Sequence, residues 1–563
     1  MNTSARFDWS AGYVSRRSPL FARNIVSTSH PLAAQAGLAL LQAGGNAVDA
    51  AIATAACMTV VEPCSNGLGS DAFCILWDGR QLHGLNASGP APAAWTPEFF
   101  QGQVMPRRGW GSVTVPGAVG AWAALSERFG RLPFADLMQP AIEIAERGHA
   151  VPPIVQGKWA MAAGLGEITS QPGFAQAFLP QGRAPEVGEL FRFADAARSL
   201  RLIADSRGEA FYRGEIAAAL ARFARETGGA LAEADLAAYR PEWVTPLAKD
   251  FAGYTLHEIP PNGQGIAAQM ALGLLEHRGL AAHAVDSPEA QHLMIEAMKL
   301  AFADVYRFVA EPGSMPVGAA QLLDPGYLAE RARLIDPDRA QVFGAGNPVK
   351  GGTIYLTAAD ESGMMVSFIQ SNYMGFGSGL VLPGYGISLQ NRGHCFTLEA
   401  GHPNQVAPGK RPFHTIIPAF LTQDDAPVMS FGVMGGNMQP QGHLQTLVRM
   451  LCYGQNPQAA CDAPRWRFNE GLSINIEPHM PAATIEGLRA RPPGRRHPRQ
   501  LPGLRRRPVH LAPGRAGRGG LCGRQRPAAR RRGRGLVRHD CRHATPQRCA
   551  ASMPRMTKLL DLD

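Results

Sequence analysis

Residues 47–61, "AVDAAIATAACMTVV", restrict the fold more than any other part of the chain. Asn46 is a good helix cap, but the residues after it are apolar on nearly every side and show no single stripe. A helix of this kind must be covered all round by other elements. Its uncharged, mostly apolar stretch, residues 50–61, is shorter than the roughly 20 residues needed to cross a bilayer. We therefore expect a layered globular protein with this helix inside it and no membrane as partner.

Helical and strand patterns alternate along the rest of the chain. Residues 32–43 follow a Ser-His-Pro start and end at a Gly-Gly pair, and residues 289–310 form a long amphipathic pattern after Asp-Ser-Pro. Strands are predicted at residues 71–79, 353–360 and 363–371, and the last two are joined by a good hairpin connection. Helices mixed with antiparallel strands indicate a layered α/β or α+β architecture.

The net charge of +10 is unevenly distributed. Residues 489–563 contain 21 Lys and Arg against 3 Asp and Glu, no Phe, Tyr or Trp, and no period of 2 or 3.6. This tail cannot build a core. It could be a basic arm for nucleic acid, although it has none of the aromatic side chains on which bases stack. It could also be a disordered extension, or the result of a displaced reading frame near residue 489, which is the interpretation we favour.

Several kinds of site are not expected. The nine cysteines are irregularly spaced and include no CxxC, which indicates neither a disulfide framework nor zinc. "NGLGSDAF" and "GFGSG" lack the spacing and the lysine of phosphate-binding loops, and no HExxH occurs. We predict no metal and no cofactor. The N-terminus does not match a secretory signal, so a cytoplasmic location is expected.

Gly351-Gly352-Thr353 at the start of a predicted strand has a specific chemical interpretation. A threonine hydroxyl is a weak nucleophile without a base, and the α-amino group of an N-terminal threonine can be that base, with a pKa near 8. Such an N-terminus arises inside a chain if the hydroxyl attacks the preceding carbonyl and water cleaves the resulting ester. Glycines before the threonine permit the close approach that this attack needs. The alternative is an ordinary loop ending before a strand.

The chain contains an ordered series of motifs, which are "GGNAVDAAIA", "VVEPCSNGLGSDAF", "SVTVPGAVGAW", "EAMKLAFAD", "GGTIYLTAADESG", "FGSGLVLPGYGISLQNRG", "GKRPFHTIIPAF" and "VMGGNMQPQGH". Over residues 24 to 488 this series resembles the gamma-glutamyltranspeptidase family. The family implies an α+β fold, the four-layer αββα sandwich of N-terminal nucleophile hydrolases, and one proenzyme cut into two subunits. The expected domains are residues 1–352 (large subunit), residues 353–488 (small subunit) and the atypical tail 489–563.

The resemblance implies roles for five residues. Thr353 is then both the processing residue and the catalytic nucleophile, and Gly352 is the residue before the cut. Ser371 stands where the family has a second threonine that hydrogen-bonds the nucleophile. Gly435 and Gly436 match the diglycine whose N–H groups form the oxyanion hole; without the resemblance they indicate only a turn after a strand.

The specificity positions depart from those of the glutathione-cleaving members. Ser88 stands where those enzymes have an arginine for the glutamyl carboxylate, and His394 and Cys395 stand where the aspartate for the α-amino group falls. Tyr373 replaces an asparagine. A zwitterionic glutamyl group would lose two charge-assisted contacts here.

These variants look more like the amidohydrolase branch that includes oxamate amidohydrolase and resembles cephalosporin acylases. We expect an amidase or acyltransferase that acts on a small carboxylate-bearing amide, with true γ-glutamyl transfer or glutathione hydrolysis as the alternative. An inactive, unprocessed protein with a basic binding tail is a second alternative. The expected partners are the small-molecule amide and the two subunits of one precursor; a homo-oligomer is left open, and nucleic acid is not expected. Candidates for substrate contacts are Tyr373, Arg392, His414, Thr415 and Gln439, each of which could equally form structural hydrogen bonds below the site.

Overall fold

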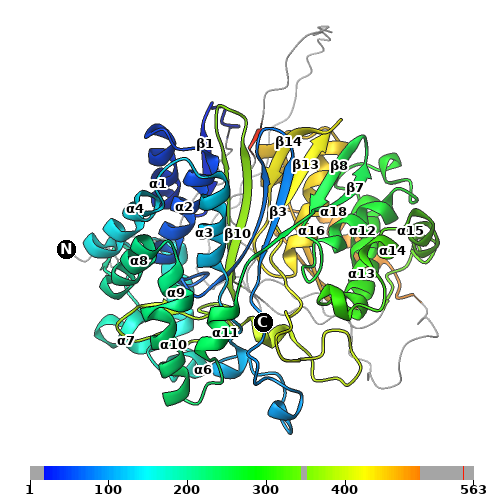
Figure 1. Cartoon of the computed structure of the whole chain (residues 1–563). Helices are drawn as coiled ribbons and strands as arrows, with labels where there is room; N and C mark the ends of the chain where they lie inside the picture. Colours follow the sequence, from blue (N-terminus) through cyan, green and yellow to red (C-terminus); the bar gives the residue numbers. More distant parts are fainter. Residues whose placement is uncertain (1–17, 344–351, 495–548, 551–563) are drawn as a thin grey trace, which may run out of the picture.

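A computed structural model describes residues 18–343, 352–494 and 549–550 of the chain. Gly351, most of the basic tail and the N-terminal residues fall outside these ranges, so the expectations for them concern undescribed parts of the chain. Two sheets stand side by side in the centre, and helices cover the outer face of each (Figure 1).

The first sheet holds the strand that begins at the predicted cleavage point. Every adjacent pair in it is antiparallel. β9 lies between β1 and β10, so segments far before and directly after residue 352 pair with each other. Its strand order is β1 (Ile25–Thr28), β9 (Gly352–Ala359), β10 (Met365–Tyr373), β2 (Asp71–Trp77), β3 (Leu82–Ala87) and β6 (Glu242–Val244).

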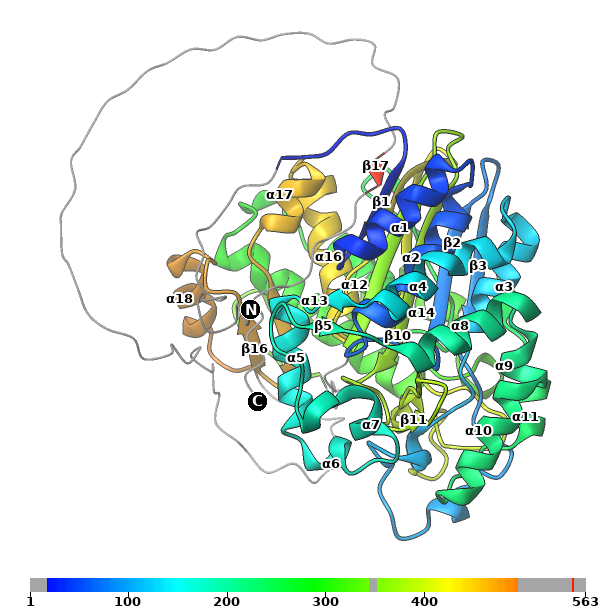
Figure 2. The ribbon, with the colours of Figure 1, turned by 90° about the vertical axis from the view of Figure 1, so that its left-hand side faces the viewer.

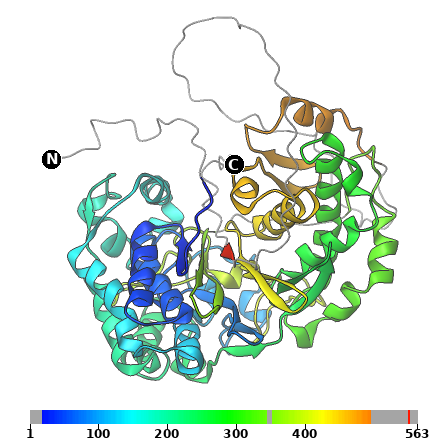
Figure 3. The same ribbon diagram turned by 90° about the horizontal axis from the view of Figure 1, so that it is seen from above.

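The second sheet packs face to face against the first (Figure 3). Odd-numbered residues of β2, β9 and β10, such as Phe73, Tyr355 and Ile369, meet Phe420 from the second sheet in one core. The period-2 alternation of strands therefore assigns this face to the interior between the sheets. The strand order is β17 (Cys549–Ala550), β14 (Ala426–Phe431), β13 (Ala419–Gln423), β8 (Tyr254–Glu258) and β7 (Leu247–Phe251), with only β17 parallel to its neighbour within the described residues.

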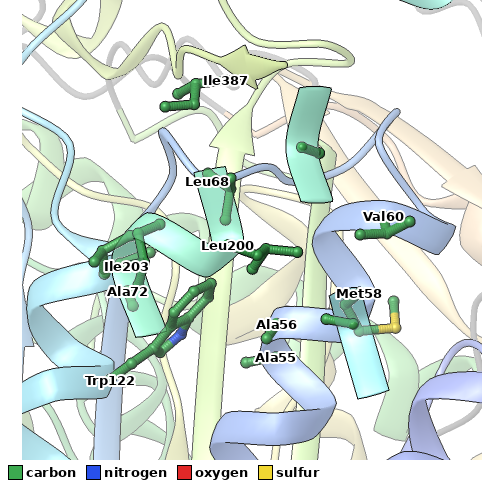
Figure 4. Close-up of a cluster of buried hydrophobic side chains, with 14 of the residues drawn as sticks. Ala55, Ala56, Met58, Val60, Leu68, Ala72, Trp122, Leu200, Ile203 and Ile387 are labelled. Atoms are coloured by element: carbon green, nitrogen blue, oxygen red, sulfur yellow. The ribbon is translucent and has the colours of Figure 1, made fainter. Parts of the chain in front are cut away.

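Helices α1 to α4 and α8 lie across the outer face of the first sheet (Figure 2). All fifteen residues of α2 are buried, as its apolar composition predicts, and Asn46 caps it by accepting from the amides of Val48 and Asp49. Figure 4 shows Ala55, Ala56 and Met58 of this helix in the same cluster as Trp122. The helices on this side are α1 (Pro31–Gln42), α2 (Ala47–Val61), α3 (Ala118–Phe129), α4 (Phe134–Arg147), α5 (Pro153–Ala163), α6 (Gly166–Thr169), α7 (Phe174–Phe178), α8 (Ala194–Ser206), α9 (Glu209–Arg213), α10 (Glu215–Glu226) and α11 (Glu233–Ala238).

A second helical layer covers the other sheet. Leu256 of β8 and Leu421 of β13 face helices α12, α13 and α16 in a separate core. This layer contains α12 (Ile266–Leu275), α13 (Pro288–Phe308), α14 (Ala319–Leu322), α15 (Pro325–Ala332), α16 (Met438–Leu447), α17 (Pro457–Asp462) and α18 (Ala482–Ala490). Short two-stranded sheets are formed by β4 (His149–Ala150) with β5 (Leu190–Phe191), β11 (Val381–Leu382) with β12 (Ile387–Ser388), and β15 (Trp466–Glu470) with β16 (Ser473–Ile476).

The order of layers is helix, sheet, sheet, helix, which confirms the predicted αββα architecture. The predicted strands 71–79, 353–360 and 363–371 correspond to β2, β9 and β10, and the predicted hairpin joins the last two. Among the described residues, no helix is both long enough and apolar enough to cross a bilayer.

Two helical glycines give opposite stability predictions. A Cβ on Gly37 in α1 would lie 2.2 Å from Thr54 Oγ1 and 2.8 Å from the Ala50 carbonyl of α2, whereas a Cβ on Gly157 in α5 would meet nothing within 4 Å. Gly37→Ala should therefore lower the free energy of unfolding by about 1–3 kcal/mol through overpacking. Gly157→Ala should raise it by about 0.5–1 kcal/mol through helix propensity. Chemical denaturation of both variants checks this; shifts of the same sign would contradict the close α1–α2 packing.

Candidate active site

Thr353 and Ser371 face each other at one end of the first sheet. Strand alternation directs Thr353 of β9, Ser371 of β10 and Asp71 of β2 to the space between the sheets, the face that Tyr355, Ile369 and Phe73 also occupy. Thr353 Oγ1 lies 3.2 Å from Ser371 Oγ, and both side chains are buried. The two predicted hydroxyls are thus in hydrogen-bonding contact.

A bulge at the end of β10 fixes the serine. The register of β9 with β10 shifts between Gln370 and Tyr373, after which Tyr373 pairs with Gly352. Tyr373 has a φ of 74°, a left-handed value that is rare for a bulky residue. Its amide donates to Ser371 Oγ at 2.8 Å. This unusual backbone conformation therefore helps orient the hydroxyl that contacts Thr353.

Gly435 and Gly436 form the turn between β14 and α16. Their φ values are 116° and 59°, which favour glycine. Their carbonyls accept from the amides of Met438 and Gln439 at the start of α16, and no described residue accepts from their own N–H groups. Two amides at the positive end of a helix can stabilise an oxyanion, which is the role that the resemblance implies for these glycines.

Arg392 is buried and has unused hydrogen-bonding capacity. It lies in the short helix η6 (Arg392–Cys395) and is 0% exposed. Its Nη1 donates to Thr415 Oγ1 at 2.7 Å, and its guanidinium lies 4.3 Å from the centre of the Tyr373 ring. Its Nε and Nη2 find no acceptor in the described chain. These two nitrogens form one edge of the guanidinium, and that edge can bind a carboxylate with two parallel hydrogen bonds.

Two further predicted substrate contacts, Gln439 and Thr415, and two of the departing specificity positions, His394 and Ser88, also have defined partners. Gln439 is buried with its Oε1 accepting from the Ile417 amide at 2.8 Å, while its Nε2 has no acceptor among described residues. The hydroxyl of Thr415 accepts the hydrogen bond from Arg392 Nη1. His394, by contrast, uses Nδ1 to contact the Met105 carbonyl at 3.0 Å. Ser88 donates to Asn86 Oδ1 at 2.7 Å.

His414 contacts Asp71, an acidic residue that was not predicted from the sequence to lie in the site. Its Nε2 lies 3.1 Å from Asp71 Oδ2, and both side chains are 0% exposed. Burial raises the pKa of Asp71 to about 7, although nearby Arg392 opposes the shift. Burial and Arg392 both lower the pKa of His414. The pair is therefore close enough to Arg392 to feel its charge, and His414 is held by Asp71 rather than projecting freely into the site.

Gln264 is a second residue that sequence reasoning missed. It lies between β8 and α12, and its Nε2 donates to the carbonyls of Thr415 and Gly436. Two sequence features could have identified these residues. Asp71 is an acid at the start of an apolar strand, and Gln264 is a polar residue in the turn "PPNGQG". Within the described ranges, no three His, Cys, Asp or Glu side chains gather as metal ligands would.

Residues 33–501 match the family model described as Gamma-glutamyltranspeptidase. The chain is 35% identical over 482 residues to the Glutathione hydrolase-like YwrD proenzyme of Bacillus subtilis, covering 84% of this chain and 91% of the relative. It is 38% identical over 476 residues to the Oxamate amidohydrolase proenzyme of Klebsiella pneumoniae, covering 82% and 89%. Both relatives are named as proenzymes.

The fold is similar to that of solved structures. The structure of cephalosporin acylase from Bacillus halodurans superposes with a TM-score of 0.82 at 48% identity, covering 86% of this chain and 91% of the acylase.

The Asp71–His414 pair predicts how stability depends on pH. The folded state keeps His414 neutral while the unfolded chain protonates it below about pH 6.5, which lowers the free energy of unfolding as pH falls. Asp71 acts in the opposite direction between about pH 4 and 7, because its carboxyl stays protonated in the folded state but not in the unfolded chain. The two contributions largely offset each other in the intact pair.

Asp71→Asn removes this offset. Below pH 6.5 its free energy of unfolding should fall, relative to the wild type, by about 1.4 kcal/mol per pH unit. His414→Gln should show the opposite trend, because only Asp71 then titrates. Urea unfolding of both variants and the wild type at pH 5.5 and 8 checks this. Identical pH dependence in all three proteins would contradict a coupled, buried pair.

Proposed function

Because the chain belongs to the gamma-glutamyltranspeptidase family, we propose that Thr353 is the nucleophile of a self-processing amidohydrolase that cleaves small amides carrying a carboxylate. The chain is an N-terminal nucleophile amidohydrolase by its family and fold.

Self-cleavage begins from the buried Thr353 hydroxyl. Its Oγ1 attacks the Gly352 carbonyl, the peptide C–N bond breaks as the acyl group moves to oxygen, and the Thr353 nitrogen takes up the proton. Water then hydrolyses the ester, leaving a carboxylate on Gly352 and a free α-amino group on Thr353. The contact between Thr353 Oγ1 and Ser371 Oγ at 3.2 Å supports this, because it orients the attacking hydroxyl.

Amide hydrolysis then uses the new N-terminus. The α-amino group of Thr353 accepts the proton as Oγ1 attacks the substrate carbonyl, and the N–H groups of Gly435 and Gly436 stabilise the oxyanion. The proton passes to the leaving amine as the C–N bond breaks. Water attacks the acyl-enzyme ester with the same base, which releases the acid and restores Thr353.

The proposed substrate class rests on the environment of Arg392. A buried cation whose Nε and Nη2 lack acceptors in the described chain is costly unless a ligand completes it. A carboxylate meeting that edge makes two charge-assisted hydrogen bonds. Thr415 and the Tyr373 ring hold the guanidinium in place, so the substrate carboxylate would be bound at a fixed position. The name of the Klebsiella relative, an oxamate amidohydrolase, fits such a substrate.

A γ-glutamyl substrate is less favoured. Ser88 hydrogen-bonds Asn86, and the thiol of Cys395 lies 4.0 Å from Arg392 Nη1, so neither supplies the charge that a glutamyl head group needs. Each missing charge-assisted contact costs about 1.5–3 kcal/mol. Glutathione hydrolysis therefore remains as the competing outcome of a substrate test, and an uncut, inactive chain as the competing outcome of a processing test.

Thr353→Ala should abolish both self-cleavage and amidase activity. Wild-type protein should run on a denaturing gel as two pieces of 352 and 211 residues, with the smaller piece beginning at Thr353. The variant should run as one chain, because it lacks the attacking oxygen. N-terminal sequencing of the smaller wild-type piece checks the position. Normal cleavage of the variant, or a different first residue, would refute the assignment.

Arg392→Met should reduce kcat/KM for oxamate by about ten- to a hundredfold and leave kcat/KM for uncharged oxamide nearly unchanged. The reason is that only oxamate presents a carboxylate to the guanidinium. Ammonia release by processed protein measures both rates. Wild-type protein should also hydrolyse oxamate faster than glutathione or γ-glutamyl-p-nitroanilide, whose hydrolysis is followed by release of cysteinylglycine and of p-nitroaniline.

Arg449→Met is the matched control, since Arg449 is a buried arginine held by Asp286 and the Pro464 carbonyl. Its substitution should not change the preference for oxamate over oxamide. Equal losses on both substrates in Arg392→Met, or γ-glutamyl compounds as the best substrates, would overturn the proposed substrate class while leaving the test of Thr353 intact.

A further inference from the structure

Gln264 joins two parts of the site that lie on different elements. It is fully buried, and its Nε2 donates to the Thr415 carbonyl at 2.6 Å and to the Gly436 carbonyl at 3.0 Å. Because both partners are carbonyl oxygens, only the nitrogen of the side-chain amide can face them. One amide group therefore spans the gap between the segment before β13 and the turn before α16.

The backbone around Gln264 makes this bridge rigid. The Gln264 amide donates to the His414 carbonyl at 2.9 Å, and the His414 amide donates to the Asn262 carbonyl at 2.9 Å. Asn262 also donates through Nδ2 to the Pro412 carbonyl at 2.7 Å. Residues 262–264 therefore run alongside residues 412–415, so the side chain of Gln264 starts from a fixed position.

Each end of the bridge holds a functional group. Thr415, whose carbonyl Gln264 contacts, uses its hydroxyl to hold Arg392 Nη1. Gly436, whose carbonyl Gln264 also contacts, belongs to the turn that presents the oxyanion-binding amides. A small substrate with a carboxylate near its amide must meet Arg392 and these amides together, and catalysis falls steeply when such groups are displaced by about 1 Å.

We propose that Gln264 is a positioning residue that sets the distance between the carboxylate-binding Arg392 and the oxyanion-binding turn at Gly435–Gly436. This inference rests on the proposed function of those residues. Gln264 itself touches neither reacting atom; it acts through Thr415 and Gly436 and so matches the site to short acyl groups.

Gln269 offers a matched control on the adjoining helix. It is also fully buried, and its Nε2 also donates to two carbonyls, those of Leu247 and Leu256, each at 3.0 Å. Those carbonyls belong to β7 and β8 rather than to the site. Gln264→Met and Gln269→Met therefore each remove a buried amide bridged to two carbonyls, but only the first removes the connection between Arg392 and the diglycine turn.

The experiment measures initial rates of ammonia release from oxamate and oxamide, together with thermal unfolding. Gln264→Met should lower kcat by at least about tenfold on every amide that the wild type cleaves, and it should reduce the preference for oxamate over oxamide. Gln269→Met should keep kcat and the preference within about twofold of the wild type. Gln264→Asn keeps the amide but shortens the side chain by one methylene. It should lower kcat and the preference for oxamate over oxamide, each by less than Gln264→Met does.

The outcomes separate the two proposals. If Gln264→Met matches Gln269→Met in kcat and in substrate preference, the positioning role is wrong even though the proposed function stands. If Gln264→Met does not fold, Gln264→Asn decides by the same criterion. If wild-type protein is no more active than Thr353→Ala on any amide tested, the proposed function fails, and the role of Gln264 fails with it.

Discussion

The antiparallel pairing of β9 with β10 is the constraint on which the rest of the site depends. It brings Thr353 and Ser371 to the same face of the sheet and sets their hydroxyls 3.2 Å apart. Because β1 flanks β9 and β2 flanks β10, both strands of this hairpin are held by hydrogen bonds to segments from the first part of the chain. Two pieces produced by a cut before Thr353 would therefore share one sheet and one core, which explains how they could remain associated.

The fold follows closely from local patterns in the sequence. Residues 47–61 are buried on all sides as their composition requires, and the 353–371 hairpin forms because two β-branched runs flank a good turn. The partners of the site residues could not be found in this way. Asp71 and His414 are 343 positions apart, and Gln264 reaches partners 151 and 172 positions away. The periodicity of apolar residues along a short segment does not reveal contacts at such sequence separations. They become visible only when the two sheets are packed together.

The predicted substrate contacts differ in whether their side chains are free to bind a ligand or are already hydrogen-bonded within the protein. Arg392 and Gln439 keep unused donors, which suits contact with a substrate, whereas His414 is committed to Asp71 and Thr415 to Arg392. The sequence placed all four in one group because spacing alone cannot distinguish a free donor from a satisfied one. The domain boundary at residue 352, the nature of the tail and the cytoplasmic location stay predictions.

The central claim is that the chemistry passes through an ester on the hydroxyl of Thr353. Intact and peptide mass spectrometry of processed protein, quenched by acid shortly after mixing with a slowly cleaved carboxylate-bearing amide, tests this most directly. The claim predicts an added mass equal to the substrate acyl group on the peptide that begins with Thr353. An adduct on another residue, or turnover without any adduct on that peptide under conditions where hydrolysis of the ester is rate-limiting, would contradict it.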